Sequence, residues 1–488
     1  MTNICNYRGN SKENAGKRNI KLLRLIDNFC KNKELKKILN IISNKLNVPT
    51  SYLLQDVKIY LHRNYSTKKM KFSNKLNLFY LPISMLSFFL FFIYISIFSS
   101  KRKIKKIKTE LLIDEILHKR EAEKFSKLKK FFKKTLFIIY RKFDTKYQSY
   151  SFLNYRGLNK NLLFNKVPEL IFSLFFISTI FSIKKRVNIF HILIFLISQI
   201  FKYKNIFSNI KGKYLIQERH YATSAIKSFL FKKSGGKSFS VFQKVIPQLM
   251  GPGTYAYADI FFTLGNETHR KAIVSSGNFK KIIPVGSLFM ENIFFQKKIR
   301  KKIDFDLLNV ISDGPNFSDG FKNYEKNWIE HLSWLKKLSD EDKKLKIVIK
   351  RRPNDKLDKN NFLNDFFKNS GVQIIFGETP LNKEYSYEHC MRSKVVCTWS
   401  STMGYELIGH NKPCIFMDPN GENLSFVPSD ELHKPIKVTN YKEFRRKFYI
   451  YKENKNKFFK KIKKENFCLK SNKVSERVFK SLKQYSFK

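Results

Sequence analysis

Three strongly apolar stretches stand out in the pattern of hydrophobic and polar positions. The first, residues 76–100, contains no charged residue, and its central part is about long enough to cross a bilayer as a helix. The second and third, residues 170–183 and 187–201, are shorter, which is more typical of buried or interfacial helices. Three interpretations of the first stretch remain open. It is an in-plane or re-entrant membrane helix, a single span, or a buried helix of an α/β domain.

The flanks of the first stretch favour the in-plane or re-entrant interpretation. Lysines precede it between residues 68 and 75, and a basic cluster follows it between residues 101 and 108. Both flanks therefore prefer the cytoplasmic side of a membrane, whereas a single span would export one of them. We expect a protein held peripherally or monotopically at the cytoplasmic face of the inner membrane.

Beyond residue 100, short apolar runs alternate with amphipathic segments. Strands are predicted at residues 110–115, 136–140, 213–218, 259–264 and 281–285, with helices at 118–134 and 225–232. The second half repeats the pattern, with helices at 324–338 and from 402 to 408 and with strands at 308–312, 346–350, 373–376, 394–398 and 413–417. This alternation is typical of parallel sheets with helical crossovers.

The pattern divides the chain into five parts. Residues 1–75 are a basic helical segment, and residues 76–100 are the apolar membrane-associated helix. Residues 101–300 and 301–440 are two doubly wound, Rossmann-like domains, and residues 441–488 are a basic helical tail.

Composition adds a strong positive charge. The 488 residues include 95 Lys and Arg against 39 Asp and Glu, a formal net charge of +56, which attracts anionic partners. The basic residues are spread along the chain, so a uniform compositional bias explains them as well as a binding patch does. The six cysteines are scattered without a zinc-like spacing, which indicates free thiols in a reducing compartment and predicts no metal site.

A run of hydroxyl residues marks one strand-to-helix junction. Ser400, Ser401 and Thr402 follow the strand at 394–398, and Glu406 lies one turn further on. Open α/β sheets bind ligands at the carboxyl ends of their strands, and a helix N-terminus suits phosphate. These residues are candidates for binding a donor nucleotide, with Glu406 accepting from ribose. An ordinary helix cap with Glu406 in a capping box is the alternative.

Two further groups of residues are candidates for chemistry. Lys350 and Arg352 end another strand of the same sheet, where they would bind phosphate. Glu218, His220 and Asp259 lie near strand ends upstream and are candidate catalytic bases. A solvated basic loop and merely solvated side chains are the respective alternatives.

Taken together, these features resemble a family. The two-domain layout, the hydroxyl run with Glu406, and residues 413–419 are similar to GT-B-fold glycosyltransferases of bacterial surface-carbohydrate (capsule and lipopolysaccharide) biosynthesis. Within that group, the chain most resembles polysialyltransferase-like and CDP-glycerol glycerophosphotransferase-like proteins. Residues 258–265, Gly277 and residues 284–287 resemble the junction between the two domains of such enzymes.

The resemblance implies a pair of domains facing a cleft and a nucleotide-sugar donor as substrate, with no cofactor and no metal. It also implies one departure, because Arg352-Pro353 stands where these families often carry a His-Pro pair. An Arg neutralises phosphate but does not act as an acid near neutral pH. Leaving-group protonation by this residue is therefore not expected, whereas charge stabilisation is.

The resulting hypothesis is a metal-independent glycosyltransferase. It would transfer a sugar or related group from a nucleotide-activated donor to a surface-glycan acceptor, either a glycan or a lipid-linked one, with no specific nucleic acid as partner. Two alternatives remain: a catalytically silent GT-B-like membrane scaffold, and a basic nucleic-acid-binding protein.

Overall fold

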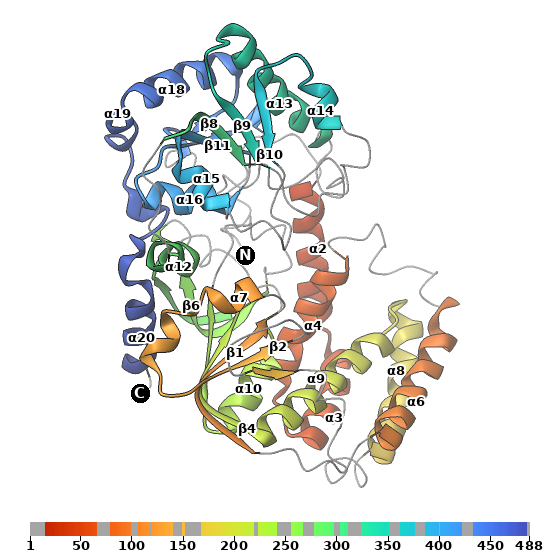
Figure 1. The fold of residues 1–488 in the computed structure, drawn as a ribbon. Helices are drawn as coiled ribbons and strands as arrows, with labels where there is room; N and C mark the ends of the chain where they lie inside the picture. The colour runs from red at the N-terminus through yellow and green to blue at the C-terminus, as the bar shows by residue number, and fades with distance from the viewer. Residues whose placement is uncertain are drawn as a thin grey trace.

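The computed structural model describes residues 15–65, 79–98, 106–116, 119–139, 149–151, 167–218, 223–241, 255–266, 278–296, 303–310, 324–350, 362–375, 386–399, 401–421 and 433–485. Within these residues the strands form two parallel sheets, one in each half of the molecule (Figure 1).

The first sheet has the order β3-β2-β1-β4-β5-β6-β7, and every neighbouring pair is parallel. Its strands are β1 (Ile107–Ile116), β2 (Thr135–Ile139), β3 (Ser149–Ser151), β4 (Ile210–Gln217), β5 (Lys237–Val241), β6 (Tyr257–Thr263) and β7 (Asn278–Pro284). The chain moves outward from β1 to β3, then returns to the other side of β1 with β4. The strand order therefore reverses between β1 and β4.

Side chains alternate between the two faces of this sheet, as a pleated strand requires. On β1, Leu112 faces one hydrophobic cluster, while Leu111 and Ile113 face another. On β4, Leu215 belongs to the first cluster and Tyr214 to the second. Both faces of the sheet are thus buried, which is the usual state of a parallel sheet.

Helices from distant parts of the chain cover the two faces. One face lies under a helical layer formed by α2 (Ala15–Cys30), α3 (Lys33–Leu46), α4 (Thr50–Tyr65), α9 (Phe190–Asn209) and α10 (Ala225–Lys233). The other face is covered by α7 (Lys119–Glu123), η1 (Leu128–Phe131), α12 (Leu288–Gln296) and α20 (Val474–Gln484). The N-terminal helices therefore pack as part of the first domain.

The second sheet has the order β10-β9-β8-β11-β12-β13, again entirely parallel. Its strands are β8 (Phe305–Val310), β9 (Ile347–Lys350), β10 (Val372–Ile375), β11 (Ser393–Thr398), β12 (Cys414–Met417) and β13 (Lys437–Val438). The helices around it are α13 (Tyr324–Glu341), α14 (Phe362–Phe366), α15 (Ser386–Met391), α16 (Thr402–Gly409), α18 (Tyr441–Glu453) and α19 (Lys455–Phe459). Here the order reverses between β8 and β11. The predicted pair of doubly wound α/β domains is therefore confirmed.

The chain crosses back to the first domain through residues 464–473, which include the short turns η8 (Lys464–Asn466) and η9 (Ser471–Lys473). The N–H of Leu469 donates to the carbonyl of Leu264 at 2.9 Å. A Cβ on Gly265 of the first domain would lie 2.6 Å from the carbonyl oxygen of Glu465, and one on Gly409 would lie 2.5 Å from that of Cys468. Both glycines therefore allow this segment to pass between the domains at backbone contact distance. In Figure 1 the dark blue α20 then lies beside the first domain.

The first and second apolar stretches form α6 (Leu81–Phe98) and α8 (Val167–Lys185), which stand at the edge of the molecule in Figure 1. The third forms α9, most of which is buried in the helical layer. Among the described residues, no helix combines the length and the apolar character needed to cross a membrane.

Candidate functional site

The reversal point of the second sheet brings three strand ends into one row. Thr398 of β11 pairs with Val310 of β8, and Val310 pairs with Lys350 of β9. The Thr398 hydroxyl donates to the Val310 carbonyl at 2.9 Å, which fixes the central part of the row. In doubly wound sheets, ligands bind outside the carboxyl ends of the strands at this point.

Helix α16 begins directly above this row. Ser401 is its N-cap, with an extended backbone (φ −88°, ψ 132°), and its Oγ accepts from the Met403 N–H at 3.3 Å. A Cβ at position 404 would lie only 2.5 Å from the Phe416 ring. Because Gly404 has none, the helix can pack closely on β12. Ser401 and Thr402 are half-buried at the positive end of this helix. Ser400 lies outside the described residues.

Lys350 supplies a positive charge at the same edge. It is the last residue of β9 and only 3% exposed. Its place in the row is two strands away from Thr398, which corresponds to about 10 Å between backbones. The structure thus brings Lys350, Ser401 and Thr402 to one edge of the sheet. Arg352 lies outside the described residues.

Glu406 does not play the capping role that was the alternative interpretation. The N3 position after the Ser401 cap is Gly404, so Glu406 does not form the predicted capping box. Its carboxylate is 2% exposed, and it accepts from the Ser287 hydroxyl at 2.5 Å and from the Tyr387 hydroxyl. Since Ser287 follows β7, this carboxylate joins the two domains. Its predicted contact with ribose stays a prediction.

The reversal point of the first sheet holds a different set of groups. Glu218 follows β4 and is 2% exposed, and its carboxylate lies 2.5 Å from the ammonium of Lys124. The neighbouring strand β1 carries Asp114, which forms a 2.8 Å ion pair with Lys227 of α10. All four side chains are buried, so each charge meets an opposite one away from water. The structure places Glu218 at the strand edge where a catalytic group was predicted.

A third buried acid stabilises the same region. Asp56 of α4 accepts from the Ser224 hydroxyl and from the Ala225 N–H, each at 2.6 Å. It thereby satisfies the first turn of α10. Burial raises the pKa of Asp56 to about 6, against the opposing effect of these hydrogen bonds.

Of the other two candidate bases, the structure describes only Asp259, and it does not bring Asp259 to this edge. Asp259 is the third residue of β6, in the amino-terminal half of that strand, and its carboxylate lies 2.9 Å from Lys232 and 3.5 Å from Lys280. It is therefore far along the strand from the end where ligands bind in such sheets. His220 lies outside the described residues.

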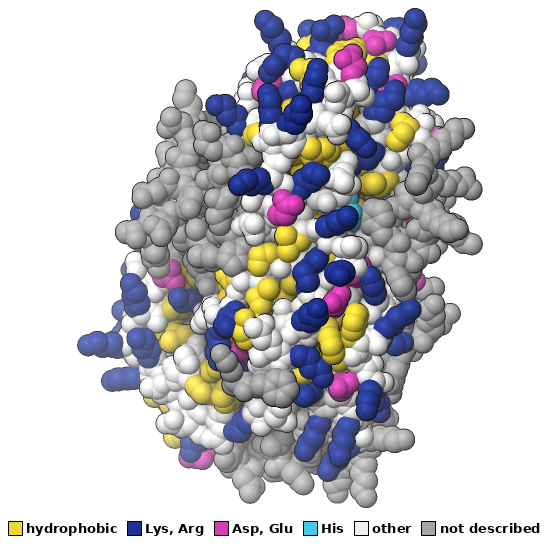
Figure 2. All heavy atoms as spheres, turned by 90° about the vertical axis from the view of Figure 1, so that its left-hand side faces the viewer, with side chains coloured by type: hydrophobic (Ala, Val, Ile, Leu, Met, Phe, Trp, Pro, Cys, Tyr) yellow, Lys and Arg dark blue, Asp and Glu magenta, His cyan; other side chains and the backbone are white. Residues whose placement is uncertain are grey.

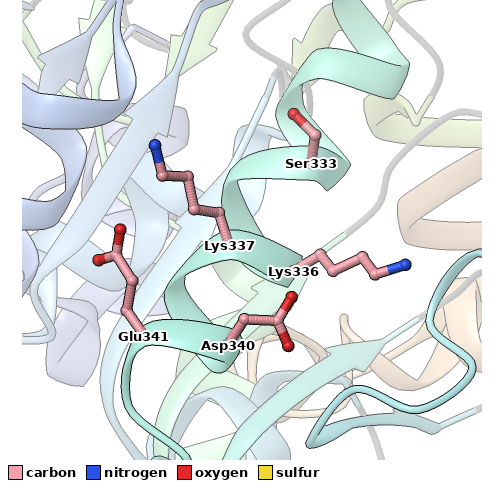
Figure 3. Close-up of a pocket in the computed structure, with 5 residues that line it drawn as sticks. All are labelled: Ser333, Lys336, Lys337, Asp340 and Glu341. Atoms are coloured by element: carbon pink, nitrogen blue, oxygen red, sulfur yellow. The ribbon is translucent and has the colours of Figure 1, made fainter.

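A hollow of about 410 Å³ lies against α13 and is shown in Figure 3. All five labelled residues come from one helix, away from the strand ends. Lys336 donates to the Phe366 carbonyl at 2.8 Å, and Glu341 accepts from the Tyr441 hydroxyl at 2.7 Å. These side chains serve helix packing, so we assign no ligand to the hollow. In the described part of the chain, no cluster of three or more His, Cys, Asp or Glu residues suits a metal ion.

Sequence reasoning missed the partners of the acids it selected. Lys124, Lys227 and Tyr387 were not singled out, since each meets its partner only through the fold, and Ser287 was noted only as part of the junction between the domains. One signal was available: Ser224 immediately precedes an apolar helical run, which is an N-cap pattern. Asp114, at the end of a predicted strand, was a second.

Comparisons with known proteins show likeness in structure. No protein-family model matches the chain, and no curated protein matches it. The UDP-N-acetylglucosamine 2-epimerase from Rickettsia bellii is 12% identical, with 78% of this chain and 97% of that chain covered and a TM-score of 0.45. The UDP-GlcNAc 2-epimerase from Neisseria meningitidis, bound to UDP-GlcNAc, is also 12% identical, with 78% and 100% covered and a TM-score of 0.45.

The wall teichoic acid polymerase TagF is a further similar structure. It is 10% identical, with 84% of this chain and 98% of that chain covered and a TM-score of 0.43. At this level of identity and TM-score, these similarities assign neither an activity nor site residues to the chain. The functional argument therefore depends on the geometry of the strand ends.

Proposed function

We propose that the chain is a glycosyltransferase that transfers a sugar or related group from a nucleotide-activated donor to a surface-glycan acceptor. One observation carries the proposal: the Ser401-capped N-terminus of α16 stands at the reversal point of the second sheet, in line with the buried Lys350. The positive end of a helix, hydroxyls and an ammonium at one strand edge form a suitable site for phosphate.

The chemistry follows from where charge develops. When the bond between sugar and nucleotide breaks, negative charge grows on the departing phosphate. The helix N-terminus and Lys350 stabilise that charge, with Ser400, Thr402 and Arg352 as further proposed donors. These groups supply the positive potential without a bound cation, which is the basis for proposing metal independence.

On the acceptor side we propose Glu218 as the first base to test. It is the one candidate in the described residues that lies past the carboxyl end of a strand at the first reversal point. To accept a proton from an acceptor hydroxyl, its carboxylate must exchange its contact with Lys124 for one with the acceptor. The acceptor class proposed is a growing glycan, lipid-linked or free.

A binding screen on the full chain tests the donor site. Titration with uridine, cytidine, adenosine and guanosine diphosphates, followed by calorimetry, is expected to find at least one specific ligand. Ser401→Ala, Thr402→Ala or Arg352→Ala is then expected to lower that affinity roughly tenfold to a hundredfold, the effect of losing a charge-assisted hydrogen bond.

Matched controls come from α13 and the turn that follows it. Lys337→Ala removes a positive charge from the exposed surface of the helix, where Lys337 lies over the Tyr441 ring, and Lys343→Ala removes one from the turn, where Lys343 pairs with Asp340. Neither should change the affinity for the nucleotide appreciably. Equal effects of site and control variants would show a general response to charge and would reject the donor site.

A catalytically silent scaffold is the second candidate, and one observation favours it. Two of the three carboxylates selected as functional, Glu218 and Glu406, are already held in buried contacts. The enzyme would be supported if the wild type turns over a nucleotide-sugar that it binds, and if Glu218→Gln still binds that nucleotide-sugar but does not turn it over. Binding without turnover would support the scaffold.

A nucleic-acid-binding role has less support. On the face shown in Figure 2, Lys and Arg side chains are spread over the whole length of the molecule and are mixed with apolar and acidic ones. Such a surface attracts anions in general without presenting a distinct docking patch. Salt-dependent DNA binding, measured beside the nucleotide screen, separates the two roles.

A further inference from the structure

Helix α6 presents an apolar surface that is exposed in the part of the chain that the structure describes. Ile83, Leu86, Leu90 and Ile93 follow helical spacing, and each has more than half of its surface exposed. The opposite side of the helix is buried, with the Phe88 ring 5.3 Å from that of Phe190 in α9. The helix is therefore fixed to the protein along one side only.

Helix α8 continues this surface. Phe172, Phe176, Ile180 and Ile183 repeat at helical spacing and are each more than half exposed. The two helices contact each other through Phe89 and Phe175, whose ring centroids are 4.9 Å apart. Together their outward sides form one apolar face, which we call the α6/α8 face. Contiguous apolar surface of this kind marks an interaction site.

The ends of the α6/α8 face indicate what it contacts. Lys184, Lys185 and Arg186 close α8 and are all exposed. Along the chain, α6 is followed by Lys101, Arg102 and Lys103. Basic residues bordering an apolar helical face suit a bilayer with anionic headgroups, since the apolar side chains enter the acyl region while the charges stay at the headgroups.

Two aromatic residues support the same orientation. Tyr80 and Tyr94 flank the apolar positions of α6 and are about half exposed. Tyrosine combines an apolar ring with a polar tip, and it is enriched at membrane–water interfaces. Because α6 is held along its inner side by α8 and α9, it can lie in the plane of the membrane without crossing it.

We propose that the α6/α8 face docks the protein on an anionic bilayer, with both helices lying in the headgroup–acyl boundary. The proposal does not depend on the donor site, and an inactive scaffold would dock in the same way. A second protein or a second copy of the chain is the competing occupant, and the test includes it.

The test uses the purified full chain and vesicle flotation. Vesicles of phosphatidylcholine mixed with phosphatidylglycerol are expected to carry the wild type. The double variant Leu90→Ser/Phe176→Ser should reduce partitioning by at least about tenfold, because it removes two large apolar side chains from the lipid contact. Lys184→Gln/Lys185→Gln should reduce it by about fivefold per lysine on these vesicles and far less on pure phosphatidylcholine.

Matched controls use apolar residues exposed elsewhere. Leu25→Ser on α2 and Ile329→Ser on α13 remove side chains that are 44% and 37% exposed, away from the α6/α8 face, and should leave partitioning unchanged. Circular dichroism should show the same melting temperature for the Leu90/Phe176 variant as for the wild type, since both side chains are exposed.

Three outcomes would overturn the proposal. The first is a wild type that does not float with anionic vesicles, and the second is a Leu90/Phe176 variant that floats as well as the wild type does. The third is a wild-type dimer, detected by light scattering, that this variant dissociates while vesicle binding stays unchanged. That result would assign the face to self-association.

Discussion

The two domains share the order of six strands, to which the first domain adds β7, but they place different chemistry at their reversal points. In the first domain, Glu218 and Asp114 meet Lys124 and Lys227 as buried ion pairs. In the second, a hydroxyl N-cap and the buried Lys350 stand at the corresponding edge, and the Ser401 hydroxyl accepts from the Met403 N–H of its own helix. The same topology thus carries two buried acid–base pairs at this edge in one domain, and a helix cap with a buried lysine in the other. The fold fixes where a site can lie, and the side chains decide what it binds.

The largest expected effect breaks an ion pair of the first domain. Lys227→Met leaves Asp114 buried without its partner at 2.8 Å, and we expect the free energy of unfolding to fall by about 3–5 kcal/mol. Chemical denaturation monitored by circular dichroism measures the change. Lys232→Met is the control, because Lys232 is partly exposed and its pair with Asp259 should contribute only about 0–1 kcal/mol. Equal losses in the two variants would contradict a special role for the buried pair.

The next effect concerns the carboxylate that joins the domains. Glu406→Gln weakens the contacts with Ser287 and Tyr387 and should lower the free energy of unfolding by about 1.5–3 kcal/mol. Glu443→Gln, on a partly exposed carboxylate of α18, is the matched control. Nucleotide affinity is measured on the same samples. Reduced affinity at unchanged stability would instead support the predicted contact with ribose.

The third prediction concerns the segment that crosses between the domains, where we expect a loss of stability no larger than that of Glu406→Gln. Gly409→Ala would place a Cβ 2.5 Å from the Cys468 carbonyl oxygen, which forces the crossing segment to shift and should cost about 1–3 kcal/mol. Gly212→Ala is the comparison, since its nearest neighbour is the Phe231 ring at 3.3 Å. Thermal unfolding of both variants measures the difference. A stable Gly409→Ala protein would show that the two domains separate more easily than the close contact suggests.

The pH dependence of stability compares one buried histidine in each half. Burial lowers the pKa of His62 in the first domain to about 4 and that of His331 in the second to about 3. The unfolded chain binds these protons near pH 6.5, so stability is full above that value and falls as the pH drops toward the folded values. Each histidine contributes a slope of at most about 1.4 kcal/mol per pH unit.

Unfolding free energies between pH 7 and about pH 5 measure this slope, within the window set by these pKa values. His331→Asn should remove the contribution of one proton from the slope of unfolding free energy against pH. His62→Asn should do the same for the histidine of the first domain. An unchanged slope in either variant would show that its imidazole is accessible to protons in the folded state.

The local pattern predicted most of the fold because most strands are short apolar runs. The strand predicted at 394–398, for example, lies within Ser393–Thr398. The pattern missed β3, β5 and β13, which are short or rich in polar residues, so that only pairing in the sheet defines them. The charged run at 118–134 was predicted as one helix, but it forms the short helix α7 and the separate 3-10 turn η1. Lys124, directly after α7, contacts Glu218.

The site was predicted less completely for the same physical reason. Glu218 and Lys124 are 94 positions apart, and Glu406 and Ser287 are 119 apart. Periodicity reports on neighbours along the chain, so it identifies a strand end but not the side chain that the fold brings to it. His220, Arg352 and Ser400 lie outside the described residues, and their roles stay predictions.

The return of α20 to the first domain has a consequence for biosynthesis. Val474, Val478 and Leu482 cover a face of the sheet whose last strand, β7, leaves the ribosome much earlier. Domains generally fold as they emerge, with the N-terminal one first. In this chain the part of that apolar face that α20 covers stays exposed until the second domain has been synthesised. We therefore expect a transient dependence on chaperones that bind nascent chains, confined to that interval and relieved when α20 docks.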